Sequence, residues 1–252
     1  MHGKYYLKTI SPDFDASLFN AATGGTDVLF DWQEILIPTG ACNLKSFAGT
    51  IIGTNGGTGN GVDFKLYFAK SIDGVAPASF GTVHAPNTVV IASTHRRNIL
   101  GFINIDASSV DDADALRCYN VIGNRIGLAD NRPDDLILQG EPNQDNASFS
   151  SIYVAGIAAG AAFDFGTDVD LNDASHVAAQ TAPLQITTSG TDPRNVFQPG
   201  DILAGETGTV TMEVVSVDSS VLMTVKDISA QIDHQEQFIL KNPMVLQFGF
   251  EY

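Results

Sequence analysis

Cysteine is scarce in this sequence, which contains only Cys42 and Cys118 among 252 residues and has no CxxC spacing. Two cysteines cannot build the disulfide framework that holds a small secreted domain together. We expect both thiols to be reduced and partly buried. A chain of this length can instead bury a sizeable hydrophobic core, and 44% of its residues are hydrophobic.

Basic residues are also few, since 13 Lys and Arg oppose 29 Asp and Glu and give a net charge of −16. Residues 1–132 carry 10 basic and 12 acidic residues (net −2), whereas residues 133–252 carry 3 and 17 (net −14). Such a surface repels phosphates, so we expect no direct binding to nucleic acid or to anionic membranes. Two interpretations stay open: a solubilising acidic face, or an acidic half that projects outward while the near-neutral half docks on a partner.

Long hydrophobic runs are missing as well. The longest apolar run covers residues 152–163, which is too short for a membrane-spanning helix. The first residues, MHGKYYLKTISPDF, lack a basic segment followed by an apolar one, so we expect no signal peptide. These features predict a soluble protein made in a cytoplasm, which can still leave the cell inside a particle.

The chain contains many short segments in which apolar and polar residues alternate. In VDFKLYFAK (62–70), Val62, Phe64, Leu66 and Phe68 fall on one face, as in a half-buried antiparallel strand. The last residues, MVLQFGFEY, alternate in the same way. The fold class we predict is all-β: an antiparallel, jelly-roll-like β-sandwich with a second small β-barrel or β-tulip-like module inserted before the last strand.

The predicted boundaries follow from changes in composition. Residues 1–26 are interpreted as an N-terminal arm, residues 27–158 plus 236–252 as the sandwich, and residues 159–235 as the acidic small β module. Within that module, Pro199-Gly200-Asp201 is typical of a turn, and residues 218–220 join two matched strands in a predicted hairpin. One helix signal occurs, where Ser109 precedes a run of acidic residues ending at Leu116.

Catalytic motifs are absent from the sequence. No HxH, HExxH or GxSxG motif occurs, and the Gly-rich segment 55–61 is followed by a strand pattern rather than by a helix or Lys-Ser/Thr. We therefore predict that the protein is not an enzyme and needs no cofactor. The five histidines are far apart along the chain: His2, His84, His95, His176 and His234.

An acidic segment, residues 164–173, is the only candidate for a metal site. Asp168, Asp170 and Asn172 alternate like the first ligands of a calcium loop. However, Asp173 stands where an EF-hand has its glycine, and Ala179 stands where it has its glutamate. An EF-hand is thus rejected, and a solvated acidic loop is the alternative to a looser calcium site.

Two segments are candidates for contacts with other proteins. Lys4, Tyr5, Tyr6 and Leu7 form a strand pattern in the arm, which could reach an adjacent subunit. His95, Arg96 and Arg97 form the only basic cluster and could bind a carboxylate of a neighbouring subunit, although a solvated strand edge is the simpler interpretation. Trp32 lies in a strand pattern and is interpreted as a core residue rather than a sugar platform.

Several segments together resemble virion structural proteins of marine tailed phages, especially the cyanophage type. The resemblance covers DVLFDWQEILIPTGACNLKSFAGTIIGT with its Ile-Pro-x-Gly-Ala turn at 37–41, the segment 62–81, FQPGDILAGETGTVTMEVVSVDSS, and the terminal strand after Asn242-Pro243. It extends over about two-thirds of the chain and includes no catalytic motif, so no residue-level role follows from it.

The resemblance implies a capsid decoration or cement protein that docks on the capsid shell and stabilises it. Its implied partners are a major capsid protein and copies of itself, as a trimer or another homo-oligomer, in a virion assembled in the host cytoplasm. A tail or head–tail component of the same particle is the near alternative. A carbohydrate- or receptor-binding β module is the second, and an enzyme the third.

Overall fold

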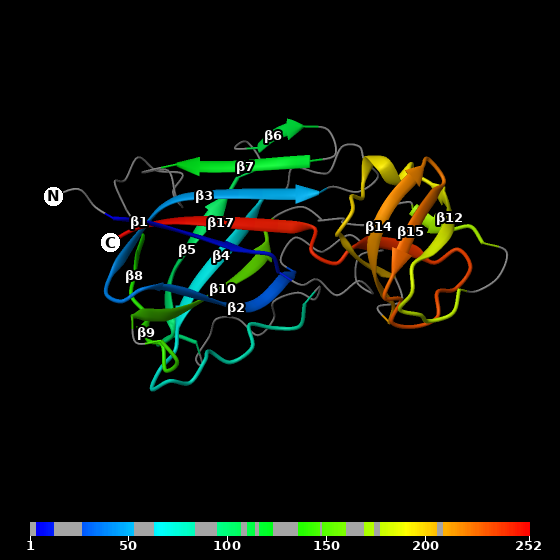
Figure 1. The fold of residues 1–252 in the computed structure, drawn as a ribbon. Helices are drawn as coiled ribbons and strands as arrows, with labels where there is room; N and C mark the ends of the chain where they lie inside the picture. The colour runs from blue at the N-terminus through cyan, green and yellow to red at the C-terminus, as the bar shows by residue number, and fades with distance from the viewer. Residues whose placement is uncertain are drawn as a thin grey trace.

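The computed structural model describes residues 4–12, 27–52, 63–83, 95–106, 110–113, 116–122, 136–146, 148–159, 169–173, 177–205 and 209–252. These residues form two antiparallel sheets and a closed barrel (Figure 1). Neither α-helices nor cis peptide bonds occur in this part of the chain.

The two sheets pack face to face as a sandwich. The first sheet has the order β1 (Tyr5–Ile10), β17 (Met244–Glu251), β3 (Cys42–Ile52), β7 (Leu116–Ile122) and β6 (Val110–Ala113), and β8 (Leu136–Leu138) also pairs with β3. The second sheet has the order β2 (Val28–Pro38), β10 (Phe149–Ala158), β4 (Phe64–Lys70) and β5 (Ile99–Ile105), and β9 (Glu141–Pro142) pairs with β10.

The sandwich core lies between the inner faces of these sheets. Phe64, Leu66 and Phe68 of β4 are fully buried, which confirms the face predicted from their alternation. Phe248 of β17 reaches across to the second sheet, with its ring centroid 5.7 Å from that of Phe68, and it lies 5.5 Å from Phe47 in its own sheet. Aromatic pairs at these separations and inclined angles add to the stabilisation from apolar burial.

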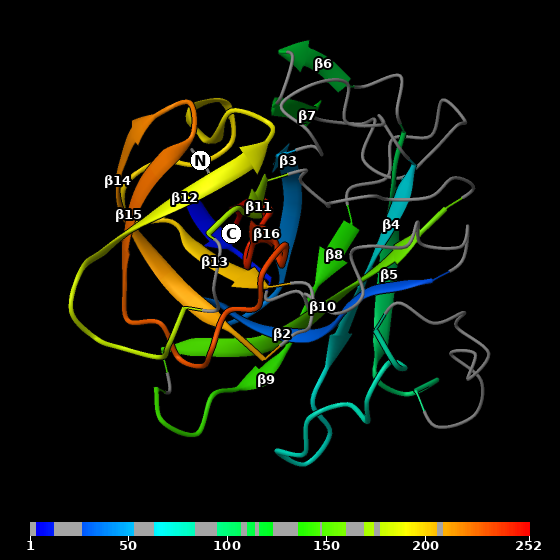
Figure 2. The ribbon, with the colours of Figure 1, turned by 90° about the vertical axis from the view of Figure 1, so that its right-hand side faces the viewer.

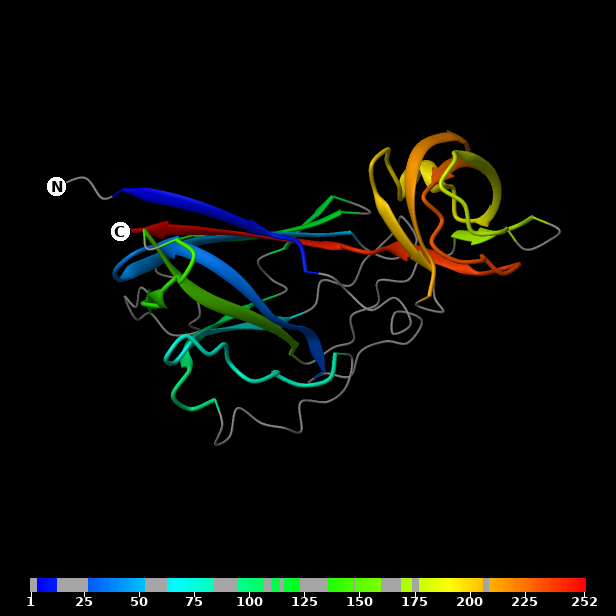
Figure 3. The same cartoon turned by 60° about the horizontal axis from the view of Figure 1, so that its bottom comes forward.

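The barrel is inserted in sequence between β10 and β17. Its strands close in the order β11 (Val169–Leu171), β12 (Leu184–Gly190), β15 (Leu222–Lys226), β14 (Thr211–Ser219), β13 (Ile202–Gly205) and β16 (Gln237–Leu240). Figure 2 shows these strands curving round a common axis, and in Figures 1 and 3 the barrel lies at the end of the sandwich away from both chain termini. The predicted sandwich with a small barrel before the last strand is thereby confirmed.

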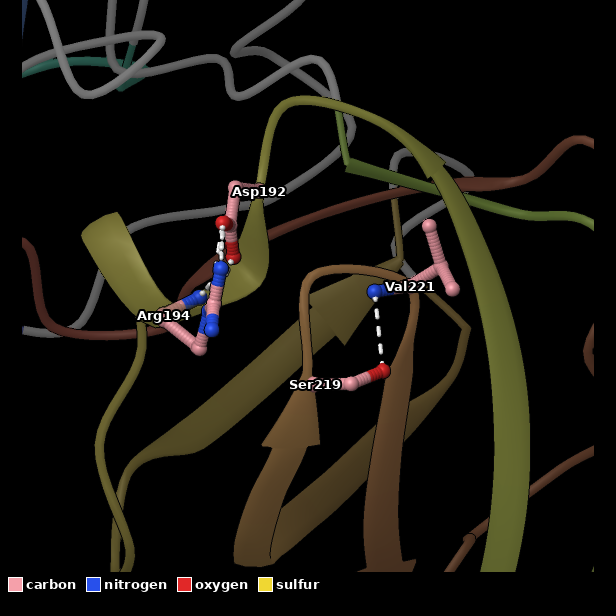
Figure 4. A network of polar contacts seen from close by, with 4 residues as sticks. All are labelled: Asp192, Arg194, Ser219 and Val221. Carbon is pink, nitrogen blue, oxygen red and sulfur yellow. Dashed lines mark hydrogen bonds and ion pairs between the residues drawn. The ribbon is translucent and has the colours of Figure 1, made fainter.

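The predicted hairpin between β14 and β15 is present, and its turn is stabilised by Val221, whose backbone N–H donates to Ser219 Oγ at 3.3 Å. A short 3-10 helix, η5 (Pro193–Asn195), lies nearby (Figure 4). The Asp192 side chain caps it by accepting from the Arg194 backbone N–H and also pairs with the Arg194 guanidinium, 2.6 Å from Oδ2 to Nη2.

The barrel has a hydrophobic core of its own. It includes Ile186, Leu203, Met223, Val225 and Phe238, all fully buried.

The helix predicted from Ser109 to Leu116 is wrong. Residues 110–113 form β6 and pair antiparallel with β7, with Val110 opposite Tyr119 and Ala113 opposite Leu116. Aspartate is a poor former of helix interiors, and pairing at the edge of an existing sheet supplies backbone hydrogen bonds that a short isolated helix would have to form alone.

The predicted boundary at residue 235 also differs from the structure. β16 begins at Gln237 and closes the barrel between β11 and β13, so the barrel strands extend to Leu240. The sequence FILKNPMVL contains apolar residues on both sides of Asn242-Pro243, so the sequence alone does not assign them to different modules. Strand pairing places residues 238–240 in the barrel and residues from Met244 onward in the sandwich. The other predicted boundaries stay predictions.

Candidate interaction surface

One row of residues crosses the outer face of the first sheet at the end away from the barrel. Backbone pairing places Tyr5 of β1 opposite Glu251 of β17, Glu251 opposite Asn43 of β3, and Asn43 opposite Ile137 of β8. Paired residues in a sheet point to the same face, so these four side chains lie side by side. The next row begins with Leu7 opposite Gly249.

This face exposes more apolar surface than single scattered residues would. Tyr5 is 73% exposed, Leu7 63% and Ile137 61%, and of the large hydrophobic residues in the described ranges only Val75, at 69%, is comparable. We call Tyr5, Leu7 and Ile137, together with Lys45 and Glu251, the outer-face patch. Contiguous exposed apolar groups of this kind mark interaction sites more often than isolated ones do.

Polar groups in the patch are paired with each other. Lys45 Nζ lies 3.4 Å from Glu251 Oε2, between the apolar side chains of β1 and β8. Gly249 keeps the centre flat, because a Cβ at this position would collide with Ser46 Oγ and would touch Leu7 Cδ2 at 3.4 Å. A flat surface with apolar groups and an internal ion pair can bury area against another protein without leaving a charge unpaired.

The predicted arm segment is found in this patch. Lys4 joins the sheet through two backbone hydrogen bonds with Tyr252, and β1 follows directly. Tyr6 points to the opposite side from Tyr5 and Leu7 and packs against Phe149 at a centroid distance of 6.0 Å. Residues 5–10 thus belong to the sheet of their own chain. Residues 1–3 and 13–26 of the predicted arm lie outside the described ranges. Contact of the arm with a second subunit therefore stays a prediction.

The predicted basic cluster divides into a buried and an exposed part. His95 is only 1% exposed, and its Nε2 lies 2.7 Å from the carbonyl oxygen of Ala78, so this ring is a structural element and not a surface contact. Arg96 and Arg97 are exposed at the turn before β5, which belongs to the second sheet. The structure therefore does not place this cluster and the segment Lys4–Leu7 on the same sheet.

The candidate calcium ligands are only partly described. Asp168 lies outside the described ranges, Asp170 is in β11, and Asn172 is exposed just after it, where its backbone N–H donates to Thr187. Across the described ranges, no group of three or more His, Cys, Asp or Glu side chains is arranged to hold a metal ion. Thr187 also donates its N–H to Asp173 Oδ2 at 3.2 Å.

Trp32 lies on the outer face of the second sheet in a small cluster with Phe80 and Tyr67. Its indole N–H donates to Ala78 O at 2.9 Å, and its ring meets Phe80 edge-on at 4.8 Å. Burial raises the pKa of Tyr67, whose ring contacts the half-exposed Phe102 at 5.5 Å. The indole is therefore held by the protein itself, under the segment that precedes residue 83.

Carboxylates with shifted pKa values have structural roles in the described ranges. Backbone N–H groups of Gly74 and Asp73 lower the pKa of Glu141, which accepts both at 2.9 Å. On the barrel, Ser216, Thr224 and Gln185 donate to Asp218 and lower its pKa.

In the core of the sandwich, Cys42 is a free thiol. Burial raises its pKa, and the thiol donates to Pro38 O at 3.6 Å.

Sequence reasoning found the β1 part of the patch and missed Ile137, Lys45 and Glu251. Residues 136–138, Leu-Ile-Leu, are all apolar, so no alternation shows which of them points outward. Pairing of Ile137 with Asn43 settles this, because neighbouring Leu138 is fully buried. Glu251 and Lys45 are separated by most of the chain, and no spacing pattern joins them.

Comparison with known proteins gives little. No protein-family model and no curated protein matches the chain. Among solved structures, one that is similar over 99% of this chain is described as the infectious bursal disease virus VP2 subviral particle, with 10% sequence identity and a TM-score of 0.16. The chain spans 41% of the length of that protein, and a likeness this weak carries no argument about fold or function.

In the part of the chain that the structure describes, no helix is both long and apolar enough to cross a bilayer.

Proposed function

We propose that the chain is a non-enzymatic structural protein of a virus particle, of the tailed-phage type that its sequence resembles. In this proposal it decorates the capsid shell, docks through the outer-face patch and stabilises the shell. The observation that carries the proposal is the patch itself: Tyr5, Leu7 and Ile137, each more than half exposed, surround the Lys45–Glu251 ion pair.

The distribution of charge supports the same orientation. The patch lies at the end of the sandwich away from the barrel, and residues 159–235, which include most of the barrel, carry 11 acidic and 2 basic residues. Both basic residues pair internally, Arg194 with Asp192 and Lys226 with Glu213. A docked sandwich would leave this acidic barrel in solvent, where its charge repels other acidic surfaces and limits unspecific association.

The location is tested by immunogold electron microscopy of purified particles of the phage that encodes the chain, with an antibody against the chain. We expect label spread evenly over the head. Label confined to the tail or to one vertex would move the protein to the tail or head–tail role. Particles without any label would contradict the virion proposal.

The docking surface is tested with particles assembled without the chain, to which purified variants are added before sedimentation. Ile137→Asp places a charge in the patch without touching β1, and Val221→Asp is its matched control, because Val221 is 48% exposed on the barrel hairpin. We expect Ile137→Asp to weaken shell binding about tenfold or more, as for a central interface residue. Equal binding by both variants would contradict docking through the patch.

A further inference from the structure

The first sheet ends at β1, next to β17 (Figure 3). The outward edge of β1 presents a defined set of backbone groups. The Lys4 N–H donates to Tyr252 O at 3.2 Å, and the Tyr252 N–H donates to Lys4 O at 3.0 Å. Because hydrogen-bonded pairs alternate along an antiparallel ladder, the even-numbered residues of β1 face β17. Tyr5, Leu7 and Thr9 therefore direct their N–H and C=O groups outward, and in the described ranges these backbone groups have no partner.

The side chains of this edge leave it open to pairing. Tyr5, Leu7 and Thr9, whose backbone groups point outward, are exposed and uncharged, and Lys8, which is half-buried, is the charged residue of β1. At the opposite edge of the same sheet, β6 has the sequence VDDA and carries Asp111 and Asp112 in succession. Charged residues on an edge strand oppose pairing with another chain, whereas a neutral and partly apolar edge is a template for it.

We propose that β1 pairs antiparallel with β1 of a second copy of the chain, with Leu7 opposite Leu7 on a two-fold axis perpendicular to the sheet. The first sheets of the two copies then form one continuous sheet. This assignment of a partner rests on the proposed role of the chain in particle assembly. It uses the outward backbone groups of β1, whereas docking through the outer-face patch uses side chains, including those of Tyr5 and Leu7. An isologous contact of this kind closes as a dimer.

Backbone bonding and charge together select this register. Centring on Tyr5 or on Thr9 would place some outward-facing residues of β1 opposite residues that lie outside β1. Centring on Leu7 places Tyr5 opposite Thr9, so all three outward-facing residues bond, and it places Tyr6 opposite Lys8. Centring on Tyr6 would place Lys4 opposite Lys8 of the second copy, and centring on Lys8 would place the two Lys8 side chains opposite each other. Like charges directly opposite in a sheet are destabilising, whereas a lysine beside a tyrosine ring is favourable.

The first experiment measures oligomeric state by sedimentation equilibrium for the full chain and two variants of Thr9. Thr9→Pro removes an outward N–H that β17 does not use, so it blocks pairing with a second copy and leaves the ladder within the chain intact. Thr9→Val retains the N–H and is the matched control. We expect dimers for the native chain and Thr9→Val and monomers for Thr9→Pro, each folded by circular dichroism. A native chain that stays monomeric, or Thr9→Pro dimers, would overturn the proposal.

The register is tested by disulfide cross-linking in a Cys118→Ser background, which leaves buried Cys42 as the other thiol. In the Leu7 register, the two Cα atoms of Leu7→Cys lie about 5.5 Å apart, within disulfide range. Those of Thr9→Cys are separated by four residues along the strands, about 13 Å. We expect Leu7→Cys to cross-link at least about tenfold faster than Thr9→Cys. Equal rates would overturn the assigned register.

The experiments can contradict the proposed function and the proposed β1 pairing independently of each other. Dimers in solution together with particles that carry no label would contradict the virion role and leave the pairing in place. Shell binding that depends on Ile137 in a chain that sediments as a monomer would contradict the pairing and leave the docking surface in place.

Discussion

At the residue scale, Glu141 shows how one side chain joins two distant segments of the sandwich. Its carboxylate accepts N–H groups from Asp73 and Gly74, which occupy a tight turn with positive φ angles of 54° and 75°. Asp-Gly is suited to such a turn, because both residues tolerate the left-handed region and glycine does so without strain. The turn therefore depends on its own sequence for its shape and on β9 for its attachment to the sandwich.

Glu141→Gln is expected to destabilise the protein in a pH-dependent way. Because the folded-state pKa of Glu141 is lowered by the two N–H groups, its charged form contributes stability above the unfolded-state pKa, and this contribution is lost as the pH falls through the folded-state pKa. The variant should lose about 0.5 kcal/mol in urea unfolding at about pH 7, and the difference should shrink as the pH falls through the folded-state pKa. Asp145→Asn, an exposed carboxylate change, is the control; a difference for Glu141→Gln that persists in acid would contradict this account.

At the element scale, the contact between β13 and β16 closes the barrel. Gly205 pairs with Phe238, and the side chain of Glu236, which is only 3% exposed, fills the space beside Gly205. Glu236 Oε2 accepts the N–H of Asp233 at 3.0 Å and so holds the turn that leads into β16. The missing side chain at Gly205 therefore makes room for a buried carboxylate that organises the closing strand.

Gly205→Ala is expected to lower the free energy of unfolding by about 1–3 kcal/mol, because the added Cβ would overlap Glu236 Oε1 and force the side chain to shift. Chemical denaturation measures this effect, with the exposed Ser220→Ala as a control. The same substitution in a Glu236→Ala background should cost less, because the overlapping side chain is gone. Additive effects in this double-mutant cycle would show that Glu236 is not the cause.

The edge strands of the first sheet also have consequences for assembly. A two-sheet sandwich leaves strand edges open, and in this chain the two edges of the first sheet differ: β6 carries consecutive aspartates, whereas β1 carries Tyr5, Leu7 and Thr9. The proposed pairing of two β1 strands covers the edge at which Tyr5, Leu7 and Thr9 direct their backbone groups outward.

At the scale of the whole molecule, negative charge is most concentrated in the segment that forms most of the barrel. Residues 159–235 have a net charge of −9, from 11 acidic and 2 basic residues, and both basic residues already pair with carboxylates in the barrel. In the described part of this segment acidic groups outnumber basic ones, and their mutual repulsion within the barrel opposes the compact state.

Thermal stability should therefore increase with salt at low ionic strength. Raising NaCl from about 0.01 M to about 0.15 M shortens the screening length from about 30 Å to about 8 Å and weakens this repulsion. Differential scanning calorimetry at about pH 7 should show a higher Tm in the second buffer. A Tm that falls on adding salt would mean that attractive ion pairs outweigh the repulsion.

The sequence by itself determined the all-β class, the buried faces of β4 and β17, the hairpin between β14 and β15, and the place of the barrel before the last strand. These features are local or periodic: alternation selects a face, and turn residues mark where strands end. It also indicated the segment at residues 4–8 as a strand, now seen as β1.

Only the tertiary structure decided the remaining features, because they depend on which strands become neighbours. Residues 110–113 became a strand through pairing with β7, and β16 became part of the barrel through pairing with β11 and β13. Burial of His95 removed it from the basic surface, and the register across β1, β17, β3 and β8 brought Tyr5, Glu251 and Ile137 into one row. Pairing between distant segments depends on the packing of the whole core, so no short stretch of sequence encodes it.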